Sequence, residues 1–508
     1  MTTETAYVEH AVRIIADHGL DDFSSLPDSL QSCFTRSLQL IEKACSSSSS
    51  SGSDVMVDLE QVITTCQAVV ERCTEHFHSI HHSQVTRAWR RLYVDCCLLH
   101  GLAALSLSSG PATVNDGAKI SMSKDAIKAL DTALIVTSAP GPSRYELVQD
   151  IVGALQEVYI KHSKGLGPSL LKASPSSSPA FATPSVNKDA ANRHIGMEKE
   201  KQKTFCRATR KIKELDDIPG LEDYHRHYID QPFVVRRFAQ DWPALDPFFE
   251  DEDQAATALH DSVHDGSGAR GLQKWQSRQY LLERTGPCRV VPVEIGKEYT
   301  HERWRQSIVP WEDFLSKAGW SSRSTEQQEE GAEDETFYLA QHDVFNQFDR
   351  LRRDVLVPDI VYSCPPAPDG LATPYVPPLD EETGEGYIMS AWIGPAQTTS
   401  PAHTDPYYNA YVQVVGQKLV WIAPPESNEQ GGMYLSSTEG LGNTSQFPIF
   451  SPDSSDTKEG DRYELFHKLV EPKARTAVLG PGDMLVLPPG WYHAMKSLSR
   501  SFSVSFWY

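Results

Sequence analysis

The stretch SPAHTDPYYNAYVQVVGQKLVW, from Ser400 to Trp421, decides the fold of the C-terminal half. It places His403 and Asp405 two residues apart and then runs into alternating apolar residues. In an extended segment, residues i and i+2 point to the same face of a sheet, so both side chains would converge. The pair is either half of a metal site or a turn that leads into an ordinary strand.

The segment PPGWYHAM supplies a third candidate ligand, His493, just after a short apolar run and a Pro-Gly turn. Two histidines and one carboxylate form the facial triad that leaves open positions on ferrous iron, which is the geometry of oxygenases. However, an H-x-D pair also arises by chance in a chain with 18 histidines. Only the residues around the pair can therefore distinguish a metal site from a chance H-x-D pair.

Lys418 lies within VQVVGQKLVWI, a run that is otherwise almost wholly apolar. An unpaired ammonium is costly to bury, so a buried Lys418 needs an anion, and a dicarboxylate co-substrate would supply one. A lysine near the end of a core strand can also extend its ammonium to the surface. The residues by themselves leave both interpretations open.

Short β-branched runs punctuated by Pro and Gly surround this stretch, as in CRVVPVEIG, TFYLAQH and SFSVSFWY, and they predict an antiparallel sandwich or barrel. In the N-terminal part, apolar residues recur at helical spacing instead. We therefore predict an α+β chain with an all-helical domain at 1–165, a Ser/Pro linker at 166–195 and a β-rich domain at 196–508. The helical domain contains a Ser-rich loop at 46–54.

The net charge of -21, from 68 acidic and 47 basic residues, argues against direct binding to nucleic acid and favours a basic protein or peptide partner. The nine cysteines contain no C-x-x-C pair, which is typical of reduced thiols. No secretion signal is evident, and no apolar stretch approaches the roughly 18 residues of a membrane span. We expect an intracellular protein that does not enter a membrane.

Two longer segments, AWIGPAQTTSPAHTDPYYNAYVQVVGQKLVW and PGDMLVLPPGWYHAMKSLSRSFSVSFWY, resemble the Jumonji C (JmjC) oxygenases. Within these, DWPALD, VPVEIG and YLAQHDVFNQ are similar to the group of Jumonji-domain protein five, also called lysine demethylase eight. The resemblance covers roughly Asp217 to Tyr508 and extends more weakly to AWRRLYVDCCLLHGL. It implies a double-stranded β-helix, that is, a cupin-like jelly roll, with helices packed outside.

The resemblance also implies a set of site residues and the co-substrates 2-oxoglutarate and dioxygen. Fe(II) would be bound by His403, Asp405 and His493. The residues implied for 2-oxoglutarate are Tyr338, Ser400, Asn409 and Lys418, of which Lys418 would meet the distal carboxylate. Those implied for the substrate are Glu294, Gln341 and Trp392. A carboxylate beside an aromatic wall suits a guanidinium, which can pair bidentately and stack.

These expectations describe an Fe(II)- and 2-oxoglutarate-dependent protein oxygenase that hydroxylates an arginine, with histone, ribosomal or chromatin proteins as candidate substrates. Its location would be the nucleus or the cytoplasm, with the nucleus favoured. Alternatives are N-methyl-lysine demethylation, a histone-tail peptidase, for which no signature is present, and a non-catalytic chromatin adaptor. Tyr407 and Tyr408 replace the glutamine pair expected before Asn409, which leaves the substrate open.

Overall fold

The computed structural model describes residues 3–17, 23–46, 52–109, 114–164, 206, 208, 210–248, 272–296, 304–320, 335–366, 375–379, 384–438, 440–450 and 464–508. The chain forms two compact units. The first contains Met1–Pro179 together with Thr285–Val291, and the second contains Ala180–Arg284 together with Pro292–Tyr508. The linker predicted at 166–195 lies outside the described residues, so its limits stay a prediction.

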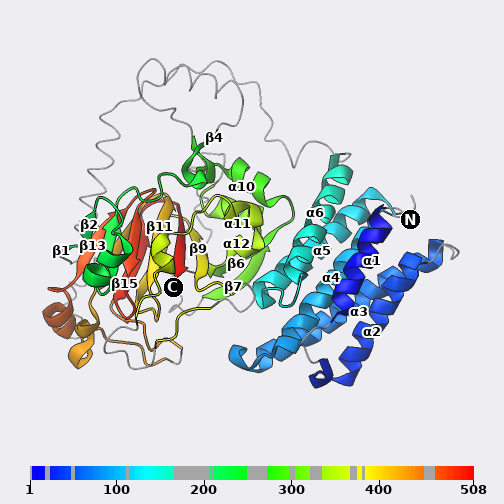
Figure 1. The fold of residues 1–508 in the computed structure, drawn as a ribbon, viewed down its shortest axis with the longest axis horizontal. Helices are drawn as coiled ribbons and strands as arrows, with labels where there is room; N and C mark the ends of the chain where they lie inside the picture. The colour runs from blue at the N-terminus through cyan, green and yellow to red at the C-terminus, as the bar shows by residue number, and fades with distance from the viewer. Residues whose placement is uncertain are drawn as a thin grey trace, which may run out of the picture. The chain divides into compact units, whose positions relative to one another are not determined.

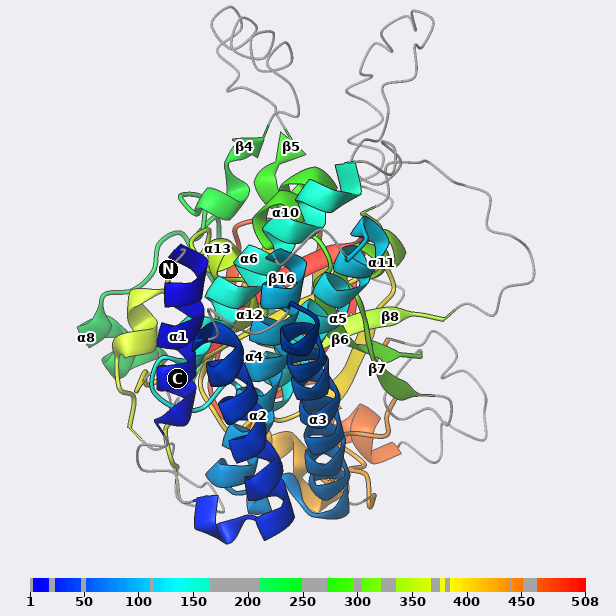
Figure 2. The ribbon, with the colours of Figure 1, turned by 90° about the vertical axis from the view of Figure 1, so that its right-hand side faces the viewer.

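The N-terminal part is helical, as its periodicity predicts (Figures 1 and 2). Its helices are α1 (Thr3–Ala16), α2 (Asp28–Ser46), α3 (Gly52–Ser79), α4 (Arg87–Ser109), α5 (Asp116–Thr137) and α6 (Arg144–Ser163), with short turns η1 (Phe23–Ser25) and η2 (His82–Gln84). All six contribute apolar side chains to one core. Helix α3 begins within the predicted Ser-rich loop, because Asp54 in its first turn suits the positive end of the helix dipole.

Helix α4 forms the centre of the helical unit and is mostly buried. Its length and hydropathy would suffice to cross a membrane, which corrects the expectation that no stretch comes close. Because 89% of its most apolar window is buried within the protein, it has the character of a core helix. Its buried Asp95 accepts hydrogen bonds from Arg91 Nε at 2.9 Å and from Arg144 Nε at 3.1 Å.

The segment Thr285–Val291 belongs to the helical unit although it is distant in sequence. Asp131 on α5 accepts hydrogen bonds from Arg289 Nη2 at 2.7 Å, from Arg289 Nε at 2.9 Å and from the Val290 N–H at 2.9 Å. Gln156 on α6 donates to the carbonyls of Thr285 and Pro287 at 3.1 and 2.9 Å. The helical unit therefore includes a strap from the C-terminal half, which the sequence did not predict.

The second unit contains the jelly roll that the resemblance implies (Figure 1). Its eight strands are β9 (Ile388–Gly394), β10 (Thr399–His403), β11 (Asn409–Val415), β12 (Lys418–Ala423), β13 (Arg475–Leu479), β14 (Met484–Leu487), β15 (Tyr492–Ser497) and β16 (Ser501–Trp507). One sheet has the order β14-β11-β16-β9 and the other β13-β12-β15-β10. All of these pairs are antiparallel.

Further strands extend both sheets. The larger sheet gains β2 (Lys213–Leu215) and β3 (Phe233–Val235) beside β14, and β8 (Phe337–His342), β6 (Val290–Ile295) and β7 (Arg305–Pro310) beyond β9. The smaller sheet gains β1 (Arg210–Lys211), while β4 (Pro247–Phe248) pairs with β5 (Leu272–Gln273). The larger sheet therefore carries the strands of the predicted substrate residues next to the jelly roll.

Short helices accompany these strands. They are α8 (Leu221–Asp223), α10 (Arg278–Thr285), α11 (Trp311–Lys317), α12 (Val344–Gln347) and α13 (Asp349–Arg352). The helical turns are η4 (Tyr224–Tyr228), η5 (Pro243–Leu245), η6 (Lys274–Gln276), η7 (Asp359–Tyr362), η8 (Pro425–Gly431) and η9 (Phe466–Val470). Helix α12 packs against β9, and helix α11 packs against β7.

Alternation along the jelly-roll strands separates two environments. On β12, Leu419 and Trp421 pack outside the smaller sheet in a cluster that includes Phe466. Val420 and Ile422 belong instead to the cluster between the two sheets. Lys418, the first residue of β12, lies two residues before Val420 and therefore faces the interior as well.

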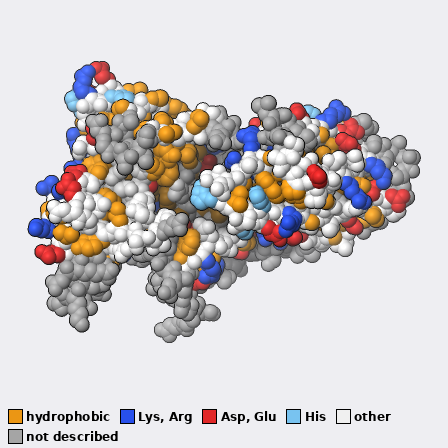
Figure 3. Space-filling model, turned by 90° about the horizontal axis from the view of Figure 1, so that it is seen from below, with side chains coloured by type: hydrophobic (Ala, Val, Ile, Leu, Met, Phe, Trp, Pro, Cys, Tyr) orange, Lys and Arg blue, Asp and Glu red, His pale blue; other side chains and the backbone are white. Residues whose placement is uncertain are grey.

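Charged side chains of both signs are interspersed over the described part of the face in Figure 3, rather than gathered into one basic field.

Candidate metal centre

The sheet register brings the predicted metal ligands together. Strands β10 and β15 are neighbours, and His403 pairs directly with His493. Asp405 lies beyond the end of β10, where its backbone carbonyl accepts a hydrogen bond from the Gly490 N–H at 2.9 Å. The ligand atoms of the three side chains all lie within 4.8 Å of one another. The irregular segment after β10, rather than the predicted strand alternation, therefore places Asp405.

Backbone carbonyls orient both imidazole rings. Nδ1 of His403 lies 2.8 Å from the Pro401 carbonyl oxygen, and Nδ1 of His493 lies 3.2 Å from that of Trp491. Because a carbonyl can only accept, each Nδ1 carries its proton, and each Nε2 faces the centre of the group. The two Nε2 atoms lie 3.7 and 3.4 Å from the oxygens of Asp405.

The charges within the group are coupled. Burial, together with the neighbouring His493, lowers the pKa of His403 to about 4. Burial also lowers the pKa of His493, but the carboxylate of Asp405 more than offsets this effect and raises it above its ordinary value. Burial favours protonation of Asp405, yet the nearby histidines leave its pKa lowered. An anionic oxygen and a neutral imidazole are thus available to a cation.

A β-bulge in β10 adds Ser400 to the same face as the metal ligands. Ser400 pairs with Met495 and His403 with His493, so three steps along β10 oppose two along β15. Regular alternation would send residues three apart to opposite faces, whereas the bulge turns both inwards. Burial raises the pKa of Tyr338, and its contact with the Ser400 hydroxyl partly offsets this rise.

Lys418 is a buried cation. Its exposed fraction is 2%, and its Nζ donates a hydrogen bond to the Tyr411 hydroxyl at 2.6 Å. Nζ also lies 5.8 Å from the ring centroid of Tyr338. No carboxylate in the described part of the chain forms an ion pair with it, and burial lowers its pKa to about 7. The structure therefore excludes an ammonium that extends to the surface.

Asn409 opens β11 and is buried. Its Oδ1 has no hydrogen-bond partner among the described residues. Leaving a buried polar atom unpaired costs about 1–3 kcal/mol, and a rotated amide can present either its oxygen or its N–H groups to a ligand. Asn409 and Lys418 therefore both have hydrogen-bonding capacity that the protein itself does not use.

Two predicted substrate residues share one face of the larger sheet. Glu294 on β6 lies directly opposite Tyr338 on β8, whose ring centroid is 6.3 Å from that of Trp392 on β9. The Trp392 Nε1 donates to Ser505 Oγ at 2.9 Å, which orients the indole. Burial raises the pKa of Glu294, and the Trp304 indole partly offsets this effect. A half-buried carboxylate and an aromatic ring thus flank Tyr338.

Gln341, the third predicted substrate residue, is exposed. It lies where the register of β8 shifts between Leu339 and His342, and its φ is 50°. No contact among the described residues joins it to Glu294 or Trp392, so its assignment stays a prediction.

The two tyrosines after Asp405 behave differently. Tyr408 is fully buried, and its hydroxyl donates to the Pro366 carbonyl at 3.2 Å. Tyr407 is half-buried, with its ring centroid 5.3 Å from that of Trp507. Tyr408 is therefore a packing residue, and Tyr407 covers the end of β16.

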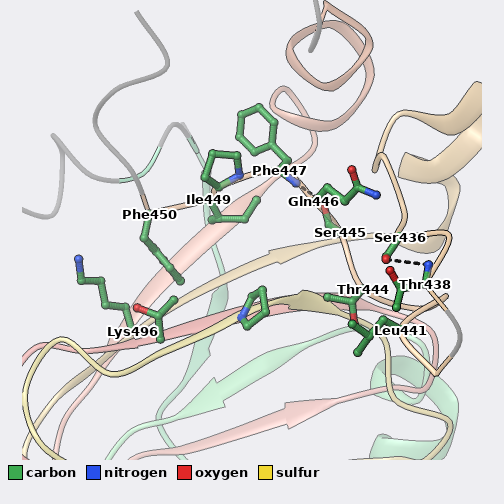
Figure 4. A pocket seen from close by; sticks show the side chains of 13 residues that line it. Ser436, Thr438, Leu441, Thr444, Ser445, Gln446, Phe447, Ile449, Phe450 and Lys496 are labelled. Carbon is green, nitrogen blue, oxygen red and sulfur yellow. Dashed lines mark hydrogen bonds between the residues drawn. The ribbon is translucent and has the colours of Figure 1, made fainter. Parts of the chain in front are cut away.

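A groove of about 590 Å³ lies outside the smaller sheet, lined by residues that include Thr399, Phe447, Ile449 and Lys496 (Figure 4). Thr399 pairs with Lys496, one step before the pair of Ser400 with Met495, so these residues face away from the metal ligands. The groove is therefore separate from the candidate metal centre.

Sequence reasoning missed Tyr411, the hydrogen-bond partner of Lys418. The signal was present, because Asn409, Tyr411 and Gln413 are spaced by two on β11 and so share one face. Three polar residues on an inward face indicate a lined cavity rather than a packed core.

The donor set fits a divalent transition metal. Two imidazole nitrogens and one carboxylate suit Fe(II), Zn(II) and related ions, and the orientation of both rings is already fixed. The unneutralised Lys418 and the unpartnered Asn409 fit a small dicarboxylate. The group formed by His403, Asp405 and His493 could therefore bind a metal together with an anionic ligand.

Comparisons with known proteins agree with this geometry. Residues 225–508 match the family model of the cupin-like domain. Jumonji C domain-containing protein 5 of Drosophila melanogaster is 31% identical over 294 residues, which are 58% of this chain and 58% of that protein. Lysine-specific demethylase 8 of Xenopus tropicalis is 29% identical over 292 residues, 57% of this chain and 51% of its own.

The protein of the same name from Danio rerio is 27% identical over 431 residues, which are 84% of this chain and 82% of its own. That match therefore reaches beyond the cupin-like segment, whereas the Drosophila and Xenopus matches span little more than half of those relatives. The family match, the jelly roll and the His-Asp-His group lead to one conclusion. The chain belongs to the cupin-like JmjC family of Fe(II)- and 2-oxoglutarate-dependent oxygenases.

Proposed function

We propose that this protein is an Fe(II)- and 2-oxoglutarate-dependent oxygenase that hydroxylates an arginine side chain of a protein substrate. The observation that carries the proposal is the buried, unneutralised Lys418 in a jelly roll that also contains the group of His403, Asp405 and His493. A metal ligand set alone would also fit other metalloproteins. A second, cationic subsite is what a dicarboxylate co-substrate requires.

In this proposal, His403, Asp405 and His493 hold Fe(II) through both Nε2 atoms and one carboxylate oxygen. The metal and 2-oxoglutarate together would supply the oxidising power that inserts one atom of dioxygen into a substrate C–H bond, while the other atom enters succinate as 2-oxoglutarate loses carbon dioxide. The chain's own residues orient the ligands and keep water out of the buried interior. Both histidine rings are held by backbone carbonyls, which limits reorganisation when the metal binds.

Four residues would receive 2-oxoglutarate. Lys418 would pair with the distal carboxylate, which restores the counter-ion that the folded chain lacks, and a charge-assisted contact of this kind is strong in a dry site. The hydroxyls of Tyr338 and Ser400, which contact each other, would donate to the same carboxylate. Asn409, with its amide rotated so that an N–H group replaces the unpartnered oxygen, would donate to the ligand.

The arginine assignment rests on Glu294 and Trp392. A half-buried carboxylate favours a partner that donates two hydrogen bonds, and a planar guanidinium can do so while it stacks on an indole. A trimethylated lysine has no N–H to donate and would leave Glu294 without a hydrogen bond. Gln341 is a further candidate contact, as the family resemblance implies.

N-methyl-lysine demethylation is the second candidate, because the Xenopus and Danio relatives are named lysine-specific demethylases. Hydroxylation of an N-methyl carbon gives a hemiaminal that collapses to formaldehyde and the free amine. The same metal and co-substrate residues would serve both reactions, so the products distinguish them.

The net charge of -21 favours a basic substrate such as a histone, ribosomal or chromatin protein. We propose an intracellular location, with the nucleus favoured over the cytoplasm because such substrates are found there.

The test is succinate formation from 2-oxoglutarate by anaerobically Fe(II)-loaded protein after exposure to dioxygen. Arginine-rich and methyl-lysine peptides are added separately and analysed by mass spectrometry, and formaldehyde is measured in parallel. We expect iron-dependent succinate with a gain of one oxygen atom on arginine. His403→Ala should abolish both products, whereas the exposed His227→Ala should preserve them.

Formaldehyde with loss of a methyl group, and no oxygen on arginine, would establish the demethylase instead. Succinate without any peptide product would retain the oxygenase and refute both substrate classes in the peptide set. No succinate from folded, iron-loaded protein would contradict the proposed function.

A further inference from the structure

The buried Tyr411 hydroxyl is the partner that Lys418 uses in the folded chain. The Lys418 Nζ donates to it at 2.6 Å, and the ring centroid of Tyr411 lies 5.4 Å from the same nitrogen. The side chain of Lys418 makes no other hydrogen bond among the described residues. Since an ammonium can only donate, the oxygen of Tyr411 must act here as an acceptor.

A buried amide two residues further along β11 determines the direction of the adjoining hydrogen bonds. The exposed fraction of Gln413 is 0%, and its Nε2 donates to the Val415 carbonyl at 2.6 Å and to Ser501 Oγ at 3.0 Å. Both of its N–H groups are thereby used. Its Oε1 accepts a hydrogen bond from Ser503 Oγ at 2.8 Å.

The hydroxyl of Ser503 has one hydrogen, which it donates to Gln413, so its oxygen is left as an acceptor. Tyr411 also contacts the Ser503 hydroxyl, and this contact partly offsets the rise that burial causes in the pKa of Tyr411. The phenol oxygen thus lies between the Lys418 ammonium and the Ser503 hydroxyl, and it accepts the hydrogen bond from Lys418. A continuous chain of contacts therefore joins Lys418 to Tyr411, Tyr411 to Ser503 and Ser503 to Gln413.

We propose that Tyr411 is a positioning residue of the co-substrate pocket, which Gln413 orients through Ser503 so that Lys418 is held for an incoming carboxylate. This inference rests on the proposed function and deepens it. Because the phenol oxygen accepts the hydrogen bond from Lys418, Tyr411 acts through Lys418 rather than directly on the carboxylate.

The physical reason is the cost of a buried ammonium. A neutral acceptor at 2.6 Å replaces part of the lost hydration and restricts the long lysine side chain to one direction. The remaining N–H groups of Lys418 stay available for the ligand. A phenylalanine at the same position would preserve the packing and remove only the acceptor.

The experiment measures the Kd of 2-oxoglutarate by isothermal titration calorimetry on full-length, Mn(II)-loaded protein. The variants are Tyr411→Phe, Ser503→Ala and the double variant. Tyr492→Phe is the matched control, because Tyr492 packs in the cluster outside the smaller sheet. Mn(II) affinity and the kcat for succinate at saturating 2-oxoglutarate in the Fe(II) enzyme are measured alongside.

We expect Tyr411→Phe to raise the Kd about tenfold, as for a hydrogen bond to a charged group, and Ser503→Ala to raise it about threefold. Because Ser503 acts through Tyr411, the double variant should bind no more weakly than Tyr411→Phe. Tyr492→Phe, the Mn(II) affinity and the saturated kcat should remain within twofold.

A Kd for Tyr411→Phe within twofold of the wild type would overturn the proposal, as would multiplicative effects in the double variant. Ser503→Ala gives an independent test if Tyr411→Phe does not fold. A wild-type protein that binds no 2-oxoglutarate would refute the proposed function itself, before any variant is compared.

Discussion

The burial of Lys418 lowers the stability of the folded protein and prepares the site for an anionic ligand. Its ammonium is buried without a counter-ion among the described residues, and the single neutral partner at 2.6 Å replaces only part of its hydration. A buried charge of this kind destabilises the folded state until an anion arrives. The missing counter-ion also favours the binding of a dicarboxylate, because the ligand neutralises an ammonium that folding has already removed from water.

Replacing Lys418 by Met should therefore abolish 2-oxoglutarate binding and stabilise the ligand-free protein. Burial lowers the pKa of Lys418 from 10.5 to about 7, so the folded state binds fewer protons than the unfolded state. Burying Lys418 therefore costs no stability above pH 10.5, where the side chain is neutral in both states. The free energy of unfolding then decreases as the pH falls from 10.5 towards 7. We expect a gain of about 2–4 kcal/mol in the free energy of unfolding at pH 7.

Urea unfolding and calorimetric titration would check both effects. The exposed Lys128→Met is the control and should change the free energy of unfolding by no more than about 0.5 kcal/mol. A destabilised Lys418→Met protein that still bound 2-oxoglutarate would contradict the assigned role.

The affinity for 2-oxoglutarate should depend on pH in the wild-type protein. Lys418 loses its charge as the pH rises through about 7, whereas both carboxylates of the ligand stay ionised. The Kd of Mn(II)-loaded protein should therefore increase from pH 6 to pH 9, by up to about tenfold per unit. Lys418→Arg, which remains charged, should give a flatter profile. A flat wild-type profile would argue against Lys418 as the titrating group.

At the scale of elements, register and bulges decide which side chains meet. The pairing of β10 with β15 sets His403 against His493, and the bulge in β10 turns Ser400 to the same face. In the helical unit, Asp131 on α5 holds the segment that leads into β6, which carries Glu294. These contacts join residues far apart in the sequence.

Arg289→Ala should destabilise the helical unit strongly. Asp131 has an exposed side-chain fraction of 0%, and the substitution would leave its carboxylate buried and without its ion pair. The expected loss is about 3–5 kcal/mol in the free energy of unfolding, measured by circular dichroism at 222 nm in urea. Lys43→Ala removes an exposed ion pair with Asp58 and should cost at most about 1 kcal/mol. Equal losses for the two variants would refute this account.

For the whole molecule, the two compact units are not two consecutive stretches of chain. The strap at Thr285–Val291 belongs to the helical unit, although the residues on both sides of it belong to the unit that contains the jelly roll. The strap supplies hydrogen-bond partners for the side chains of Asp131 and Gln156 in that unit. A helical unit cut off at the linker therefore lacks part of its own structure.

A protein of residues 1–165 should accordingly be stabilised by a synthetic peptide of residues 283–293 added in trans. Peptide binding should raise its Tm in a concentration-dependent way, because a ligand that binds only the folded state shifts the unfolding equilibrium. The same peptide with Arg289→Ala is the control and should have little effect. Identical shifts for the two peptides would contradict a specific role of the ion pair with Asp131.

Much of the fold could be predicted from local patterns. Helical spacing indicated the helical half, and the β-branched runs CRVVPVEIG, TFYLAQH and SFSVSFWY correspond to β6, β8 and β16. The chemistry of an H-x-D pair, a later histidine and a lysine in an apolar strand pointed to the metal group and its cationic subsite. These features depend on residue type and near neighbours, which a sequence states directly.

The sequence by itself thus determined the fold class and the kinds of side chain at the centre. Only the tertiary structure decided that the irregular segment after β10 places Asp405, that a bulge aligns Ser400 with His403, and that Tyr411 is the partner of Lys418. It also decided that Arg289 belongs to the helical unit. The physical reason is that register, bulges and buried ion pairs minimise the energy of contacts between distant residues, which no local pattern records.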